Sequence, residues 1–260
     1  MSALRRCLLV LSLLALRLAH AGQPCTEQPI RPETLSKAFG LALKTRESLD
    51  QSGAEVVMLA RVGQDLSKWG LRYTHLGYVW RDSPSGRWTV LHELNQCGSA
   101  RSALYAEGLA NFYADDLFRW EGLILIPPAD TQKRLAASFR SGAYAVMHEA
   151  RYNMLAYPFE ARYQNSNQWA IEVLADAEAG PFSGRGEAQA WLKRAGYQAT
   201  TLKIDTATRL AARMFRANVA FDDQPFDRRM AGQIDTVTVE SVYAWLARYA
   251  PGARRVLVRL

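Results

Sequence analysis

Hydrophobic and polar positions alternate in two neighbouring stretches of the chain, and this pattern predicts a β-hairpin. Residues 72–80 and 87–94 are rich in aromatic and β-branched side chains, as strands are. Between them, residues 82–86 read Asp-Ser-Pro-Ser-Gly, a composition that favours a turn. The hairpin carries two of the four histidines, His75 on the first strand and His92 on the second. Much of the chemistry of this protein therefore depends on whether these two imidazoles share a site.

The remaining pattern predicts a mixture of helices and strands. Helical spacing of apolar residues is found from Pro32 to a stop at Gly53, from Ser102 through Leu109, and over 130–139, 144–151, 166–177, 187–194, 205–215 and 241–249. Short apolar or extended runs predict strands over 55–60, 122–126, 200–204, 217–221 and 234–239. This mixture predicts an α+β fold, in which a small antiparallel sheet is packed by helices.

The N-terminal stretch predicts a secretory signal. Arg5 and Arg6 precede an apolar run over residues 7–16, and Ala-His-Ala at 19–21 is a cleavage site. The apolar run is too short to cross a bilayer, and no later stretch approaches 18 apolar residues. We therefore expect a periplasmic or secreted protein, with no transmembrane segment once the signal is removed.

A glycine-rich linker divides the rest of the chain. Residues 180–186 read Gly-Pro-Phe-Ser-Gly-Arg-Gly, which predicts an irregular connection. The expected organisation is a signal peptide over 1–21, a main domain over 22–180 and a small α/β C-terminal extension over 187–260, packed on the main domain.

Composition and charge indicate which kinds of molecule this protein is expected to bind. The chain of 260 residues is 49% hydrophobic and 22% charged, as an ordinary globular protein is. The formal charge of +7 falls to about +4 once Arg5, Arg6 and Arg17 are removed with the signal, and no dense basic cluster remains. Nucleic acid is therefore not an expected partner.

Removal of the signal also discards Cys7, which leaves Cys25 and Cys97. Two cysteines in an oxidising compartment predict one disulfide, which would join the N-terminus to the loop after the hairpin. The alternative is that Cys97 is a nucleophile near His92.

The order of the motifs resembles that of a known superfamily. Thr-His-x-Gly at 74–77 opens a strand, His92 lies on the next strand, and Asn-Ser-x-x-Trp at 165–169 opens a later helix. This order is similar to that of the circularly permuted, papain-like NlpC-type superfamily, which includes lecithin:retinol acyltransferase-like enzymes and YiiX-type bacterial proteins. The resemblance covers residues 54–178. The whole chain also resembles an exported bacterial family of unknown function.

The resemblance implies a permuted papain-like fold for the main domain over 22–180, and a hydrolase or acyltransferase-like protein that acts on amide or ester bonds. His75 would be the base and His92 its orienter. The family's nucleophilic cysteine is replaced here by Ser166, whose hydroxyl, unlike a thiol, needs a well-placed base and an oxyanion hole. The alternative is a catalytically inactive relative that binds a peptide or a lipid-like ligand in the cell envelope.

Each of these residues also has a structural interpretation. Ser166 could be the N-cap of its helix, because serine is a favoured capping residue. His75 could be a buried core histidine, and His92 either a core histidine or the orienter. Glu93 would be the orienter if the register of the strand shifted by one residue.

Three amides surround Ser166 in the sequence: Asn165, Asn167 and Gln168. They could line a substrate cleft, or they could satisfy the backbone of a loop. No HExxH or CxxC spacing is present, so we expect neither a metal nor a cofactor. The expected partner is a peptide, a lipid or another component of the cell envelope.

Overall fold

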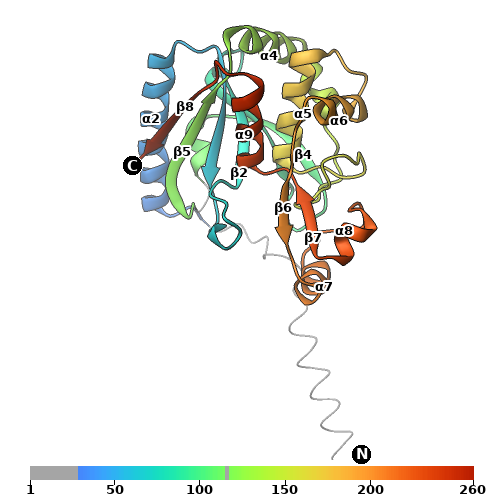
Figure 1. Cartoon of the computed structure of the whole chain (residues 1–260). Coiled ribbons are helices and arrows are strands. Elements are labelled where there is room, and N and C mark those ends of the chain that lie inside the picture. The colour runs from blue at the N-terminus through green and yellow to red at the C-terminus, as the bar shows by residue number, and fades with distance from the viewer. Residues whose placement is uncertain (1–28, 115–116) are drawn as a thin grey trace, which may run out of the picture.

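The computed structural model describes residues 29–114 and 117–260 and is built around a six-stranded sheet with the order β4-β3-β2-β1-β5-β8 (Figure 1). Every neighbouring pair of strands is antiparallel. The strands are β1 (Val56–Val62), β2 (His75–Ser83), β3 (Gly86–Asn95), β4 (Ser102–Glu107), β5 (Arg119–Ile126) and β8 (Arg254–Arg259). The predicted α+β class, with an antiparallel sheet packed by helices, is confirmed.

Helices cover both faces of this sheet. One face packs on α2 (Pro32–Ser52) and α3 (Leu109–Tyr113). The other face packs on α4 (Ala129–Ser141) and α5 (Ser166–Ala179), and α6 (Arg185–Arg194) and α9 (Val239–Tyr249) join the same core against α5. Two short 3₁₀ turns, η1 (Ser67–Trp69) and η2 (Ala143–Met147), lie in the connections.

The double covering explains the sequence of β1. All seven residues of this strand are buried. Met58 and Ala60 enter the core beneath α5, whereas Val57 and Leu59 enter the core beneath α2. A central strand buried on both faces is a continuous apolar run, and for this reason residues 55–60 show no alternation.

The predicted hairpin is present. β2 and β3 pair from Tyr78 with Leu91 to Ser83 with Gly86. Gly86 has a φ of +133°, a conformation that glycine adopts without the cost paid by other residues.

Several sequence-based predictions of secondary structure were wrong. The helix expected over 144–151 is only the 3₁₀ turn η2 followed by irregular residues, and 217–221 form no strand. Residues 102–107 form strand β4 rather than a helix, because all six pair with residues 90–95 of β3. The C-terminal strand β8 was not predicted. Its sequence, Arg-Arg-Val-Leu-Val-Arg, has few apolar residues because it is an edge strand with exposed arginines.

The C-terminal residues belong to two parts of the structure. β6 (Thr200–Lys203) and β7 (Gln233–Thr236) form a small second sheet, accompanied by α7 (Thr206–Phe215) and α8 (Phe226–Met230). In contrast, α9 and β8 pack on and complete the main sheet. The extension expected over 187–260 therefore shares its core with the rest of the protein. Among the described residues, none of the helices has the length and apolar character needed to cross a membrane.

Candidate active site

Ser166 and His75 lie in direct contact at the N-terminal end of β2, an interior strand of the main sheet. His75 is the first residue of β2 and Ser166 the first residue of α5. The distance between His75 Nδ1 and Ser166 Oγ is 3.0 Å, which is within hydrogen-bonding range. Two residues 91 positions apart in the sequence are thus brought together, as the order of the motifs predicted.

Ser166 is not the cap of its helix. The N-cap is Asn165, whose side-chain oxygen accepts a hydrogen bond of 2.8 Å from the backbone N–H of Gln168. The capping interpretation of Ser166 was therefore wrong by one position. Because Asn165 provides the cap, the hydroxyl of Ser166 is left to contact His75.

His92 and Glu107 extend the contact. His75 Nε2 lies 2.8 Å from His92 Nδ1, and His92 is fully buried. His92 Nε2 lies 3.0 Å from a carboxylate oxygen of Glu107, although the two atoms do not form a directed hydrogen bond. Glu93 is not the orienter, since it lies next to His92 on the strand and its side chain points to the opposite face.

The three contacts fit a single set of tautomers. If His92 Nε2 carries a proton facing the Glu107 carboxylate, His92 Nδ1 is an acceptor. His75 Nε2–H then donates to His92, which leaves His75 Nδ1 free to accept from the hydroxyl of Ser166. In this set of tautomers an acceptor nitrogen of His75 lies next to the serine, and a carboxylate 3.0 Å from His92 Nε2 favours the proton on that nitrogen.

Gly77 explains why this series can form. A Cβ built on Gly77 would lie 3.0 Å from the Cβ of His92 and 3.1 Å from the carbonyl oxygen of Leu91. Either contact is closer than side chains normally allow, so a larger residue would push β3 away from β2. The glycine of the His-x-Gly motif is therefore needed to keep His92 within reach of His75.

The environment of His75 keeps its ring neutral. Burial lowers the pKa of His75 well below its ordinary value of 6.5, and the positive charge of Arg61 and the neighbouring His92 lower it further. The Arg61 guanidinium donates a hydrogen bond to the carbonyl oxygen of Phe112 and lies 4.9 Å from the centre of the Phe112 ring. A neutral imidazole is the form that can accept a proton from a serine hydroxyl.

Tyr152, which the sequence analysis did not identify, also lies beside Ser166. Burial raises the pKa of its phenol well above 10, and the hydroxyl and backbone of Ser166 act in the opposite direction. The phenol is therefore protonated near neutral pH and remains a hydrogen-bond donor beside the serine.

The three amides near Ser166 have different surroundings. Asn165 caps α5 and also donates to the Thr236 hydroxyl at 2.9 Å. Gln168 is fully buried and donates to the Glu172 carboxylate at 3.1 Å. Asn167 is buried with its side-chain oxygen unpartnered among the described residues. Asn165 is thus fully engaged within the protein, whereas the side-chain carbonyl oxygens of both Asn167 and Gln168 have no partner among the described residues.

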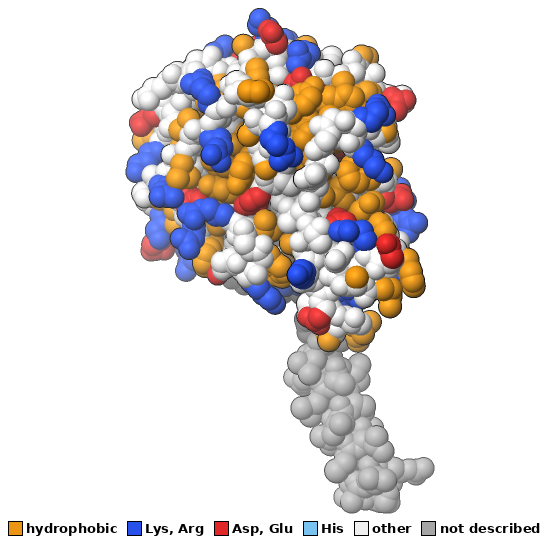
Figure 2. Space-filling view, in the orientation of Figure 1, with side chains coloured by type: hydrophobic (Ala, Val, Ile, Leu, Met, Phe, Trp, Pro, Cys, Tyr) orange, Lys and Arg blue, Asp and Glu red, His pale blue; other side chains and the backbone are white. Residues whose placement is uncertain are grey.

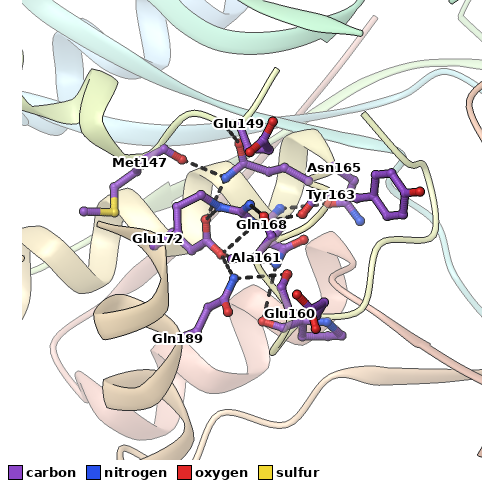
Figure 3. A network of polar contacts seen from close by, with 12 residues as sticks. Met147, Glu149, Glu160, Ala161, Tyr163, Asn165, Gln168, Glu172 and Gln189 are labelled. Carbon is purple, nitrogen blue, oxygen red and sulfur yellow. Dashed lines mark hydrogen bonds and ion pairs between the residues drawn. The ribbon is translucent and has the colours of Figure 1, made fainter. Parts of the chain in front are cut away.

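A buried polar network holds α5 against the loop before it (Figure 3). At its centre is Glu172, fully buried, which accepts hydrogen bonds from Gln164 at 2.6 Å and Gln189 at 2.7 Å. Arg185 pairs with the same carboxylate at 2.7 Å and donates to two loop carbonyl oxygens. Because the buried charge is fully paired, the network keeps the start of α5, and with it Ser166, in a fixed position.

The predicted disulfide and the predicted signal are not tested. Cys97 lies in the loop between β3 and β4, but Cys25 lies outside the described residues, as does the signal over 1–21. Both stay predictions.

Comparison with known protein families gives a match. A family model described as an uncharacterized protein conserved in bacteria (DUF2145) matches residues 48–246. The chain belongs to the DUF2145 family. The matched part of this DUF2145 protein includes His75, His92, Glu107 and Ser166. Searches among curated proteins and among solved structures gave no match, so the resemblance to NlpC-type and permuted papain-like proteins stays a prediction.

Proposed function

We propose that this protein is an exported hydrolase that cleaves amide or ester bonds with Ser166 as nucleophile. The observation that carries the proposal is the continuous series of contacts from Ser166 through His75 and His92 to Glu107. A serine hydroxyl, a neutral imidazole and a group that orients the imidazole are the components of a serine hydrolase site. The substrate would be a peptide, a lipid or another component of the cell envelope, in keeping with the predicted signal.

The geometry supports a two-step mechanism. In the first step the Ser166 hydroxyl gives its proton to His75 Nδ1 while the oxygen attacks the substrate carbonyl. The imidazolium donates through Nε2–H to His92, and it passes its Nδ1 proton to the leaving group as the carbonyl–heteroatom bond breaks. A water molecule then attacks the acyl-serine, with His75 again as the base, and the acid and free Ser166 are released.

Two groups near Ser166 suit the developing oxyanion. The backbone N–H of Asn167 lies in the first turn of α5, where N–H groups have no intrahelical partner. The phenol of Tyr152, which burial keeps protonated, is proposed as the second donor. A helix N-terminus and a hydroxyl donor are the kinds of group that stabilise negative charge on a carbonyl oxygen.

A second candidate function is binding without turnover. Ser166 is 6% exposed and His75 is 7% exposed, so little of the nucleophile or the base is open to solvent. A catalytically inactive relative that holds a peptide or a lipid-like ligand would need the same fold but no accessible serine.

The two functions are separated by covalent labelling. A fluorophosphonate probe should add one adduct per chain, mapped to Ser166 by peptide mass spectrometry, and Ser166→Ala should remove it. An adduct on another serine, or none on a folded protein, would reject Ser166 as the nucleophile and favour the binding function.

Glu107 should control the rate of the same reaction. Glu107→Gln is expected to slow labelling about tenfold, because it removes a negative charge 3.0 Å from His92 Nε2. A neutral amide no longer favours the His92 tautomer that carries the proton on this nitrogen. Glu107→Asp should restore part of the rate, and Glu47→Gln, at an exposed position on α2, should leave it unchanged. Equal rates for Glu107→Gln and the wild type would exclude a positioning role.

A further inference from the structure

Helix α7 packs on the protein with its apolar side facing outward. Leu210 and Met214, one turn apart, are 61% and 69% exposed. The side that faces the protein holds Arg209, the helix's buried residue, and the partly buried Ala212. An amphipathic helix normally buries its large apolar residues, so this orientation is the reverse of the usual one.

The reversed orientation is fixed by hydrogen bonds. The Arg209 guanidinium donates to the carbonyl oxygens of Ile204 at 3.2 Å and Arg229 at 2.6 Å, and to the Thr206 hydroxyl at 3.1 Å. A buried guanidinium needs such partners, and a rotation of the helix that buried Leu210 would remove them. The outward direction of the apolar side is therefore built into the packing.

Helix α8 repeats the arrangement beside α7. Phe226 and Met230, again one turn apart, are 69% and 62% exposed. The bond from Arg209 to the carbonyl of Arg229 ties the two helices together. Figure 1 shows both helices at one end of the molecule, beyond the small sheet, and Figure 2 shows hydrophobic side chains at the surface there. The apolar tip consists of Leu210, Met214, Phe226 and Met230.

The charge around the apolar tip is positive. From Thr206 to Arg216 the chain has three arginines and no acidic residue, and α8 has two arginines and Asp227. Arg213 and Arg216 are exposed, and neither forms an ion pair with any residue that the structure describes. Exposed apolar side chains flanked by unpaired cations are typical of segments that lie in the interface of an anionic bilayer.

We propose that the apolar tip docks on the surface of an anionic lipid bilayer, with the Arg213 and Arg216 guanidinium groups facing the lipid phosphates. A protein partner would more often present acidic side chains in fixed positions. A second copy of this chain would bring the same arginines into opposition, which disfavours self-association through the tip. The protein would then lie on a membrane surface, where its active site could reach components of the cell envelope. The docking proposal does not depend on the proposed hydrolase activity.

Vesicle sedimentation tests the proposal with the full chain. Binding is compared for vesicles of phosphatidylcholine alone and for equal parts of phosphatidylcholine and phosphatidylglycerol. The double variant Leu210→Ser/Met214→Ser should bind the anionic vesicles at least about tenfold more weakly than the wild type. The matched control is Phe39→Ser/Leu43→Ser, which removes two exposed apolar residues one turn apart on α2. It should change binding less than twofold, and whatever the N-terminal segment contributes is common to all variants.

The charge is tested separately. Arg213→Gln/Arg216→Gln should weaken binding to the anionic vesicles by about tenfold or more and leave any binding to phosphatidylcholine unchanged. Lack of binding by the wild type, equal binding to both vesicle types, or equal losses in the tip and control variants would each overturn the proposal. So would a wild-type dimer in lipid-free sedimentation that Leu210→Ser/Met214→Ser dissociates, because a second copy would then cover the tip.

Discussion

His75→Ala is expected to slow the reaction of Ser166 with a fluorophosphonate at least about a thousandfold. A serine hydroxyl is not ionised at neutral pH and depends on a neighbouring base for its reactivity. His75 is the titratable group that contacts it, at 3.0 Å, and burial with the charge of Arg61 keeps His75 neutral. The measurement is the rate of adduct formation followed by intact mass.

The chain contains a matched control for this substitution. His148 also contacts a serine, with its Nε2 3.2 Å from the hydroxyl of Ser102, but it lies outside the series of contacts that ends at Glu107. His148→Ala should therefore label at the wild-type rate. Labelling of the folded His75→Ala variant at an undiminished rate would show that His75 is not the base.

The pH dependence of labelling has a definite sign. His75 acts as a base only when it is neutral, so the rate should fall as the pH drops through its pKa. Because that pKa lies well below 6.5, the wild-type rate should stay level from neutral pH to below pH 6.5.

Glu93→Gln is expected to make the protein more stable at alkaline pH. The Glu93 carboxyl is fully buried, and its oxygens lack hydrogen-bond partners in the part of the chain that the structure describes. Burial, followed by the negative charges of Glu172 and Glu149, raises its pKa from 4.5 to about 8, although Ser102 and Arg185 act in the opposite direction. The folded protein thus keeps a proton that the unfolded chain releases above pH 4.5.

The sign follows from proton linkage. Between pH 4.5 and pH 8 the folded state binds more protons than the unfolded state, so the free energy of unfolding falls as the pH rises. From pH 5 to pH 8 the loss from this one group is about 3 to 4 kcal/mol. Glutamine has the same shape and cannot ionise, so the variant should not show this loss.

Urea unfolding of both proteins at pH 5 and pH 8 measures the effect. The comparison of variant with wild type cancels the opposite contribution of His75 and His148, whose lowered pKa values remove stability as the pH falls below 6.5. Glu47→Gln, exposed on α2, should behave like the wild type. A wild-type protein no less stable than Glu93→Gln at pH 8 would contradict a protonated Glu93.

The grouping of His75, His92 and Ser166 could be predicted from the order of short motifs, each read on a strand or at a helix start. Glu107 could not, because Ser102 to Glu107 contains residues that favour helices as much as strands. Its strand exists through pairing with β3, which is a tertiary effect. The cap was misplaced from Asn165 to Ser166 for a local reason, since both residue types cap helices well.

The pairing of β5 with β8 has a consequence for how the protein folds. Arg259 on the last strand contacts Glu121 on β5, 138 positions earlier in the chain. The sheet is complete only when residues 254–259 have paired with β5, and contacts of such long separation form slowly. Until then the edge of β5 is open to strands of other molecules, an arrangement that promotes aggregation. We therefore expect slow folding, with a yield of folded protein that falls as the concentration of unfolded chains increases.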